Sequence, residues 1–266
     1  MVSEGVSQNM ETAAIRALIL SLCAGMSTLL GALVVMVIKK SEKLVSISLG
    51  FAAGIMISVS LNDLYPTAVD SISQNNGQQG GILLTVVGML FGMLLAGMLD
   101  RFVPHQAYDR QTGESPHKNL FHVGFVSMLA LGLHNFPEGI ATFMAGYENL
   151  TLGISIAVAI AFHNIPEGIA VAMPIYFSTN SKRKAFKYTF LSGVAEPIGA
   201  LLAFLVLRPF MNAMLLGIVF SVVAGIMIYI AIEELIPSSR QYGHDRMALI
   251  STLTGVCIMP LTQMIH

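Results

Sequence analysis

The sequence His134-Asn-Phe-Pro-Glu-Gly-Ile-Ala141 decides the interpretation of the chain, because it occurs twice. It returns 29 residues later as His163-Asn-Ile-Pro-Glu-Gly-Ile-Ala170, with one residue of the eight changed. Both copies lie in apolar stretches long enough to cross a bilayer, where a carboxylate at the centre costs roughly 2.5–3.5 kcal/mol. An ionisable residue inside a membrane is a functional candidate. We interpret the repeated cluster as a metal site on a polar path through a membrane.

The composition supports a membrane location. The chain has 266 residues, 55% of them hydrophobic, and a mean hydropathy of +0.72. Charged residues make up 11%, against about 25% in an average soluble domain. This deficit excludes an ordinary soluble protein, and the net charge of −1 gives no reason to expect nucleic-acid binding. We predict one all-α, polytopic transmembrane domain over residues 1–266.

A membrane-spanning helix needs about 20 mostly apolar residues. Eight stretches meet this length, and the connections between them are short and polar. The predicted spans are 13–38, 44–66, 81–100, 121–145, 150–177, 188–207, 212–236 and 246–265.

The basic residues predict the orientation of these spans. Lys and Arg gather in the loops on the cytoplasmic side of a membrane. Alternate loops hold twelve of the 14 basic residues, and only Arg16 and Arg208 lie on the other side. The twelve are Lys39, Lys40, Lys43, Arg101, Arg110, Lys118, Lys182, Arg183, Lys184, Lys187, Arg240 and Arg246. Both termini are therefore predicted to lie outside, which agrees with an even number of spans.

The repeated sequence has the spacing of a ligand set. Residues three and four apart share one face of a helix, so each copy presents an imidazole, an amide and a carboxylate to one side. The first copy offers His134, Asn135 and Glu138, and the second offers His163, Asn164 and Glu167. Two helices that face each other would supply more ligands than one metal needs. Because carboxylates can bridge, two adjacent metal positions that share the glutamates are an option.

Three prolines mark interruptions in the fourth, fifth and sixth spans. A proline inside a helix lacks an N–H and frees the carbonyl four residues earlier. In a bilayer, freed backbone is tolerated only inside protein or beside a wet cavity. Pro137 and Pro166 belong to the repeat, and Pro197 follows a buried carboxylate, Glu196. We predict broken fourth, fifth and sixth helices around a central metal site, with Glu196 as a further ligand.

At these residues the sequence resembles the ZIP family of divalent-metal transporters. The His-Asn-x-Pro-Glu-Gly sequence and its near-repeat are typical of that family, and Glu196 in Ala195-Glu-Pro-Ile-Gly-Ala200 matches its bacterial ZupT-type branch. The resemblance implies a binuclear site. One metal position would use His134, Glu138, His163 and Glu167, and the other Asn135, Glu138, Asn164, Glu167 and Glu196. It also implies that spans one to three and six to eight form inverted repeats around spans four and five.

The resemblance further implies an importer of zinc, iron, manganese and related ions such as cobalt or cadmium. It implies a homodimer in a bacterial plasma (inner) membrane. The ions are the transported substrate, and no cofactor is expected. A His/Asn/Glu set without Cys suits borderline to hard divalent ions. Three carboxylates this close cannot all stay charged without a cation, so we expect metal binding to release protons.

Two other classes of protein stay open as alternatives. A membrane metalloenzyme is disfavoured, because neither the Glu-x-x-His order of di-iron bundles nor the His-Glu-x-x-His of metalloproteases occurs. A metal sensor without flux is the second. Five further residues are candidates along the route or, alternatively, polar groups at helix ends. Asp63 would lie near the entry, and Asp100, His105, Glu233 and Glu234 would lie near the exit.

Overall fold

The computed structural model describes residues 2–38, 41–101, 117–207, 210 and 212–262. Every long element of this part is helical, which confirms the all-α prediction. The elements are α1 (Val2–Val37), α2 (Glu42–Val59), η1 (Ser60–Leu64), α3 (Tyr65–Asp100), α4 (His117–Glu148), α5 (Leu150–Thr179), α6 (Lys182–Gly193), α7 (Ala195–Leu202), η2 (Ala203–Leu207), α8 (Ala213–Tyr229), η4 (Ile230–Leu235), α9 (Ile236–Arg240) and α10 (Asp245–Thr262).

Five stretches of the described part are long and apolar enough to cross a membrane. They are Glu11–Val37, Glu42–Met98, Leu150–Thr179, Lys182–Val206 and Ala213–Arg240. The second is 57 residues long and covers the predicted span 44–66 and all but the last two residues of 81–100. The predicted spans 121–145 and 246–265 correspond to α4 and α10, and the last extends beyond the described residues. The count of eight spans therefore stays a prediction.

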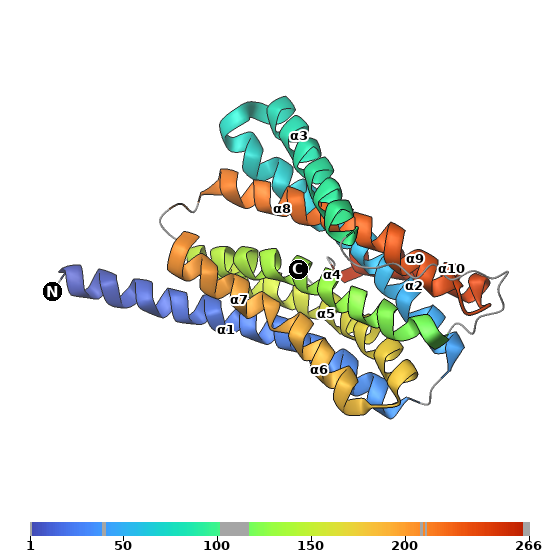
Figure 1. Ribbon diagram of the computed structural model, residues 1–266. Coiled ribbons are helices and arrows are strands. Elements are labelled where there is room, and N and C mark those ends of the chain that lie inside the picture. The colour runs from blue at the N-terminus through green and yellow to red at the C-terminus, as the bar shows by residue number, and fades with distance from the viewer. Residues whose placement is uncertain (1, 39–40, 102–116, 208–209, 211, 263–266) are drawn as a thin grey trace.

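The connection predicted between the second and third spans is helical instead of a loop. α3 begins at Tyr65, directly after η1, and reaches Asp100. Its one non-helical residue is Gly77, with φ 69° and ψ 166°. Glycine adopts a positive φ without the steric cost of a Cβ atom, so the chain can turn there. Figure 1 shows α3 turning back on itself.

The helices form two bundles (Figure 1). We call α1, α4, α5, α6 and α7 the first bundle, and α2, α3, α8, α9 and α10 the second bundle. Contacts of α2 with α5 and of α4 with α8 join them. Within the first bundle α1 packs on α5 and α7 on α4, and within the second α3 packs on α8 and α10 on α2. The inverted repeat of three spans that the resemblance implies stays a prediction.

Glycines in reciprocal pairs bring these helices together. In each pair, a Cβ on either glycine would lie 1.8–2.5 Å from a backbone oxygen of the partner helix, too close for any residue but glycine. Small residues allow such close helix crossings in lipid. The pairs are Gly31 with Gly168 (α1 and α5), Gly139 with Gly199 (α4 and α7), Gly54 with Gly255 (α2 and α10) and Gly92 with Gly225 (α3 and α8).

Two π-helical turns lie in the second bundle, η1 directly after α2 and η4 directly after α8. η1 ends at Leu64 within the sequence Asn62-Asp-Leu-Tyr-Pro66, and η4 ends at Leu235 within the sequence Glu233-Glu-Leu-Ile-Pro237. In each, the residue before the proline donates to the carbonyl five residues earlier, Tyr65 to Ser60 and Ile236 to Ala231. The proline has no N–H to donate to the carbonyl four residues earlier, so the regular α-helical hydrogen-bond pattern is interrupted. The wider π-helical turn accommodates this interruption. η1 holds one acidic residue, Asp63, and η4 holds two, Glu233 and Glu234.

The predicted breaks in the fourth and fifth helices do not interrupt the helix. α4 and α5 run continuously through Pro137 and Pro166. The sixth span is interrupted at Val194, where α6 ends and α7 begins with the residues before Pro197. One freed carbonyl is a local loss that a long helix can absorb when neighbouring helices pack closely. Breaks in α4 and α5 are therefore not confirmed.

Candidate metal centre

The fold brings the seven predicted site residues into one buried region. Their exposed fractions lie between 0 and 2%. The residues are His134, Asn135 and Glu138 on α4, His163, Asn164 and Glu167 on α5, and Glu196 on α7. In the part of the chain whose side chains are described, no other His, Asp, Glu, Lys or Arg is fully buried. Such burial is costly unless the groups are paired or bind an ion.

Two cross-helix pairs link α4 to α5. Nε2 of His134 lies 3.0 Å from both carboxylate oxygens of Glu167. Nε2 of His163 lies 3.2 and 3.4 Å from those of Glu138. Each histidine thus contacts the glutamate of the other copy, and Nδ1 of His134 lies 3.6 Å from Oε1 of Glu138. The two copies of the repeated sequence therefore form a four-residue cluster in which imidazole and carboxylate groups alternate.

The two asparagines lie on the side of the cluster next to α6 and α7. Nδ2 of Asn135 donates to the carbonyl of Ser192 at 3.2 Å. Nδ2 of Asn164 donates to the carbonyl of Ala24 at 3.0 Å and to Oε2 of Glu196 at 3.0 Å. These bonds fix the orientation of both amides. Within the described part of the chain, the oxygens Oδ1 of Asn135, Oδ1 of Asn164 and Oε1 of Glu196 are buried acceptors without a hydrogen-bond partner.

Buried acceptors without a donor are uncommon in proteins and call for an explanation. A divalent cation is such an explanation, since amide and carboxylate oxygens are ligands that hard cations prefer. Among the described residues, however, no three His, Cys, Asp or Glu side chains are spaced as a preformed metal site. The histidines and glutamates contact one another instead. A metal would therefore have to separate these pairs, with each carboxylate turning from an imidazole to the ion.

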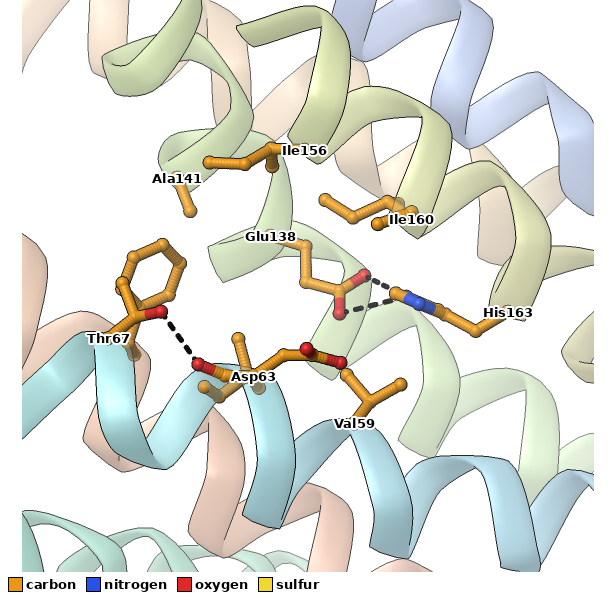
Figure 2. Close-up of a pocket in the computed structure, with 11 residues that line it drawn as sticks. Val59, Asp63, Thr67, Glu138, Ala141, Ile156, Ile160 and His163 are labelled. Carbon is orange, nitrogen blue, oxygen red and sulfur yellow. Dashed lines mark hydrogen bonds and ion pairs between the residues drawn. The ribbon is translucent and has the colours of Figure 1, made fainter. Parts of the chain in front are cut away.

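A cavity of about 90 Å³ reaches two of these residues from one side (Figure 2). Its lining includes Glu138, His163 and Asp63 of η1. Figure 2 shows the carboxylate of Asp63 between Val59 and the Glu138–His163 pair. Sequence reasoning placed Asp63 near the entry of the route without a contact to the cluster. The structure adds that both belong to one cavity, at the junction of the two bundles.

A second cavity, of about 570 Å³, continues toward the ends of α4 and α8. Three residues line both cavities: Thr67, Ile156 and Phe220. The second cavity is also lined by Glu148 and Asn212, which lie at loops predicted to face the outside. The two cavities therefore adjoin at these three residues, between that side and the Glu138–His163 pair.

The predicted exit residues are less well placed. Glu233 is exposed and Glu234 half-buried in η4, the counterpart of the turn that holds Asp63. Asp100 is the last residue of α3, and nothing is described of its side chain. His105 lies outside the described residues. Their roles on an exit route stay predictions.

Sequence reasoning missed the groups that orient the site. Besides the carbonyls of Ala24 and Ser192, the hydroxyl of Thr142 is buried near the site. It donates to the carbonyl of Glu138 at 2.9 Å and lies close to the carboxylate of Glu196. Thr142 is four residues after Glu138, so helical spacing could have indicated it. Nothing in the local sequence indicates the α1 carbonyl, because its contact depends on how the helices pack.

The fold and this site define a multi-pass membrane protein whose fully buried histidines and glutamates, among the residues described, are gathered in one cluster. A family model described as ZIP zinc transporter matches residues 104–263. The chain is 42% identical to the zinc transporter ZupT of Streptococcus mutans serotype c over 252 residues, which cover 92% of this chain and 96% of that protein. It is 42% identical to ZupT of Oceanobacillus iheyensis, with the same coverage. The ZupT of Clostridium perfringens is 38% identical, over 92% and 94%.

The chain therefore belongs to the ZIP zinc transporter family. The family confirms the predicted resemblance. It also confirms that the chain is a transporter and not an enzyme, so the metalloenzyme alternative falls. Together with the long apolar helices, it confirms a multi-pass protein of the plasma membrane.

Proposed function

We propose that this protein imports divalent metal ions, zinc foremost, into the cytoplasm through the cluster on α4, α5 and α7. One observation carries the proposal. The fully buried histidines and glutamates of the described chain gather at one place, and the cavity that reaches them adjoins a second cavity on the side predicted to be outside. A merely structural cluster would gain nothing from such cavities. A transported ion needs them.

The proposed site has two metal positions that share Glu138 and Glu167. The first also uses the nitrogens of His134 and His163, which suit zinc. The second also uses Asn135, Asn164 and Glu196, an oxygen-rich set that suits Mn²⁺ and Fe²⁺ as well. The three partnerless oxygens on that side support this division. Modest selectivity among zinc, iron, manganese, cobalt and cadmium follows.

Two steps are proposed for transport. The ion first passes Asp63, whose carboxylate draws it from the outer cavity toward Glu138 and His163. Binding then replaces the His–Glu contacts with metal–ligand bonds and releases protons, because metal ligands must be deprotonated. The site is afterwards exposed to the cytoplasm, as in other transporters whose binding site lies at the membrane centre. Eight spans with both termini outside, and a homodimer, complete the proposal.

Metal entry into proteoliposomes tests this function. The purified protein is reconstituted around a metal-sensing dye, and the entry of Zn²⁺, Fe²⁺ and Mn²⁺ is compared for the wild type, Glu138→Ala and Glu196→Ala. We expect entry in the wild type, its loss in Glu138→Ala, and a changed preference among the ions in Glu196→Ala. Asp70→Asn, a change to an exposed carboxylate on α3, is the control.

The possible failures are distinct. If the well-folded wild type admits no ion, transport is refuted and a metal sensor becomes the better account. If entry persists in Glu138→Ala, the ion passes elsewhere. If the preference of Glu196→Ala matches that of the wild type, the second metal position is refuted while transport stands.

A further inference from the structure

α1 supplies none of the seven site residues, yet its backbone contacts the oxygen-rich side of the site. The carbonyl of Ala24 accepts from Nδ2 of Asn164, and the same nitrogen donates to Glu196. Both hydrogens of that amide are then used, and its Oδ1 stays a buried acceptor without a partner in the described chain. The α1 carbonyl therefore helps to fix which atom of Asn164 is left to bind a cation.

The Ala24 carbonyl is itself held in place. The hydroxyl of Ser27 lies 2.6 Å from it, and 3.2 Å from the carbonyl of Ala161 on α5. A serine that bonds back to the preceding turn tilts that carbonyl away from the helix axis. Ser27 thus links α1 to α5 one turn from Asn164, and it supports the orientation of the carbonyl that Asn164 uses.

Gly25, the next residue, allows α1 to come this close. A Cβ atom at Gly25 would lie 2.6 Å from the carbonyl oxygen of Gly193 and 3.0 Å from both Cβ of Glu196 and Cδ of Pro197. In return, a Cβ at Gly193 would lie 2.5 Å from the carbonyl oxygen of Gly25. The two backbones therefore touch where α6 ends, directly before Glu196 starts the first turn of α7.

Real Cβ atoms are essentially never found within 3.0 Å of such atoms, so a side chain at Gly25 would have to move α6 and α7 or tilt α1. The first movement takes Glu196 away from Asn164, and the second takes the Ala24 carbonyl away from it. Either one disturbs the oxygen-rich position. The four residues of the His/Glu cluster lie on α4 and α5, and none is among the atoms that a Cβ at Gly25 would meet.

We propose that Gly25 is a positioning residue for the oxygen-rich metal position, and that it sets the metal preference by holding Asn164 and Glu196 in place. The inference rests on the proposed function. It gives α1 a definite part in ion selection, although α1 offers no ligand. Groups that orient metal ligands typically change metal affinity about 10–100-fold when they are lost.

The test compares Gly25→Ala with the wild type in the same proteoliposomes. Two quantities are measured: the ratio of Mn²⁺ to Zn²⁺ entry, and the number of zinc ions bound per chain in detergent. We expect the ratio to change by about tenfold, the lower end for an orienting group, in the same direction as in Glu196→Gln. We also expect fewer bound ions, with zinc entry through the His/Glu cluster retained.

Gly54→Ala is the matched control. A Cβ there would lie 2.1 Å from the carbonyl oxygen of Thr252, a backbone crossing as tight as that at Gly25 but in the second bundle. It should lower the melting temperature and leave the Mn²⁺ to Zn²⁺ ratio unchanged. If Gly25→Ala acted only through a loss of packing, both variants would be less stable and would keep the Mn²⁺ to Zn²⁺ ratio of the wild type. If Gly25 positions the site, Gly25→Ala alone changes that ratio.

Ser27→Ala decides the matter if Gly25→Ala does not fold. It removes the hydroxyl from the Ala24 carbonyl without adding an atom, and we expect a smaller change of the ratio in the same direction. The inference is overturned if Gly25→Ala folds and its Mn²⁺ to Zn²⁺ ratio is unchanged. If only Ser27→Ala folds, an unchanged ratio in that variant overturns it. An unchanged ratio in Glu196→Gln instead refutes the second metal position itself, so the two failures are told apart.

Discussion

The two bundles follow the same packing rule and differ in what they bury. Both cross at reciprocal glycines, Gly139 with Gly199 in the first and Gly92 with Gly225 in the second. The described polar residues buried in the second bundle are all serine or threonine. The first bundle buries histidine, asparagine and glutamate as well. Close packing is thus a property of both bundles, whereas the buried imidazole, amide and carboxylate groups of the described residues lie in the first bundle alone.

The difference has a physical basis. A hydroxyl can satisfy itself within its own helix, as Ser60 does with the carbonyl of Met56 at 2.7 Å. A buried carboxylate or imidazole cannot, and needs a partner on another helix. Helices that bury such groups must therefore be placed accurately relative to each other. Four predictions, in order of decreasing effect, test whether the two bundles divide the work in this way.

The largest effect is expected from the histidines of the first bundle. His163→Ala removes a nitrogen from the proposed first metal position and leaves buried Glu138 with only the longer 3.6 Å contact to His134. Zinc entry into proteoliposomes should fall by more than about tenfold, since loss of even an outer-shell partner costs that much. His244→Ala, a histidine before α10 in the second bundle, is the control and should transport normally. Equal losses of zinc entry in His163→Ala and His244→Ala would contradict the confinement of the metal site to the first bundle.

A glycine of each bundle separates packing from chemistry. Gly139→Ala places a Cβ 1.8 Å from the carbonyl oxygen of Glu196, and Gly225→Ala places one 2.0 Å from that of Met89. Overpacking of this kind typically costs about 1–3 kcal/mol, so both variants should melt at lower temperature. Only Gly139→Ala should reduce zinc entry, because Gly139 directly follows Glu138, the carboxylate that both proposed metal positions share. Reduced entry in a stably folded Gly225→Ala would mean that the second bundle also shapes the site.

The pH dependence of uptake tests the proton release. Imidazole nitrogens and carboxylates bind metal only when deprotonated, so zinc entry and zinc affinity should both fall as the outer pH is lowered from about 8 to about 5. The serines and threonines of the second bundle do not titrate in this range and cannot contribute. Dye fluorescence at constant inner pH measures the entry. Entry and binding that are both independent of pH would refute coupled proton release.

The smallest effect is expected from a polar contact of the second bundle. The hydroxyl of Ser58 donates to the carbonyl of Val256 on α10 at 3.0 Å. Hydrogen bonds between membrane helices average about 0.6 kcal/mol, so Ser58→Ala should shift the melting temperature only slightly. Zinc entry should match that of the wild type. A clear loss of entry would show that a hydroxyl of this bundle takes part in transport.

Much of the site could be predicted from local sequence. His134 and Glu138 stand four residues apart, as do His163 and Glu167, so any helix presents each pair on one face. The exchange of partners could not be predicted, because it depends on how α4 faces α5. Helical spacing suggests that His134 would act with Glu138, whereas its Nε2 in fact contacts Glu167.

The sequences around the two π-helical turns are also similar, a similarity that the sequence analysis did not use. Asn62-Asp-Leu-Tyr-Pro66 and Glu233-Glu-Leu-Ile-Pro237 share an acidic residue, a leucine and a proline at the same spacing. Five residues are too few to identify a repeat by themselves. The structure adds that η1 directly follows α2, that η4 directly follows α8, and that each π-helical turn ends two residues before its proline.

The sequence by itself determined the class of fold, the membrane location and the seven candidate ligands. The length of the apolar stretches, the scarcity of charge and the helical spacing of residues are local properties, so they do not depend on how the helices pack. The tertiary structure decided which histidine meets which glutamate, that Asp63 shares a cavity with Glu138, and that the Ala24 carbonyl orients Asn164. These contacts join residues up to 140 positions apart. They depend on close crossings of helix backbones, which the spacing of residues along one helix cannot specify.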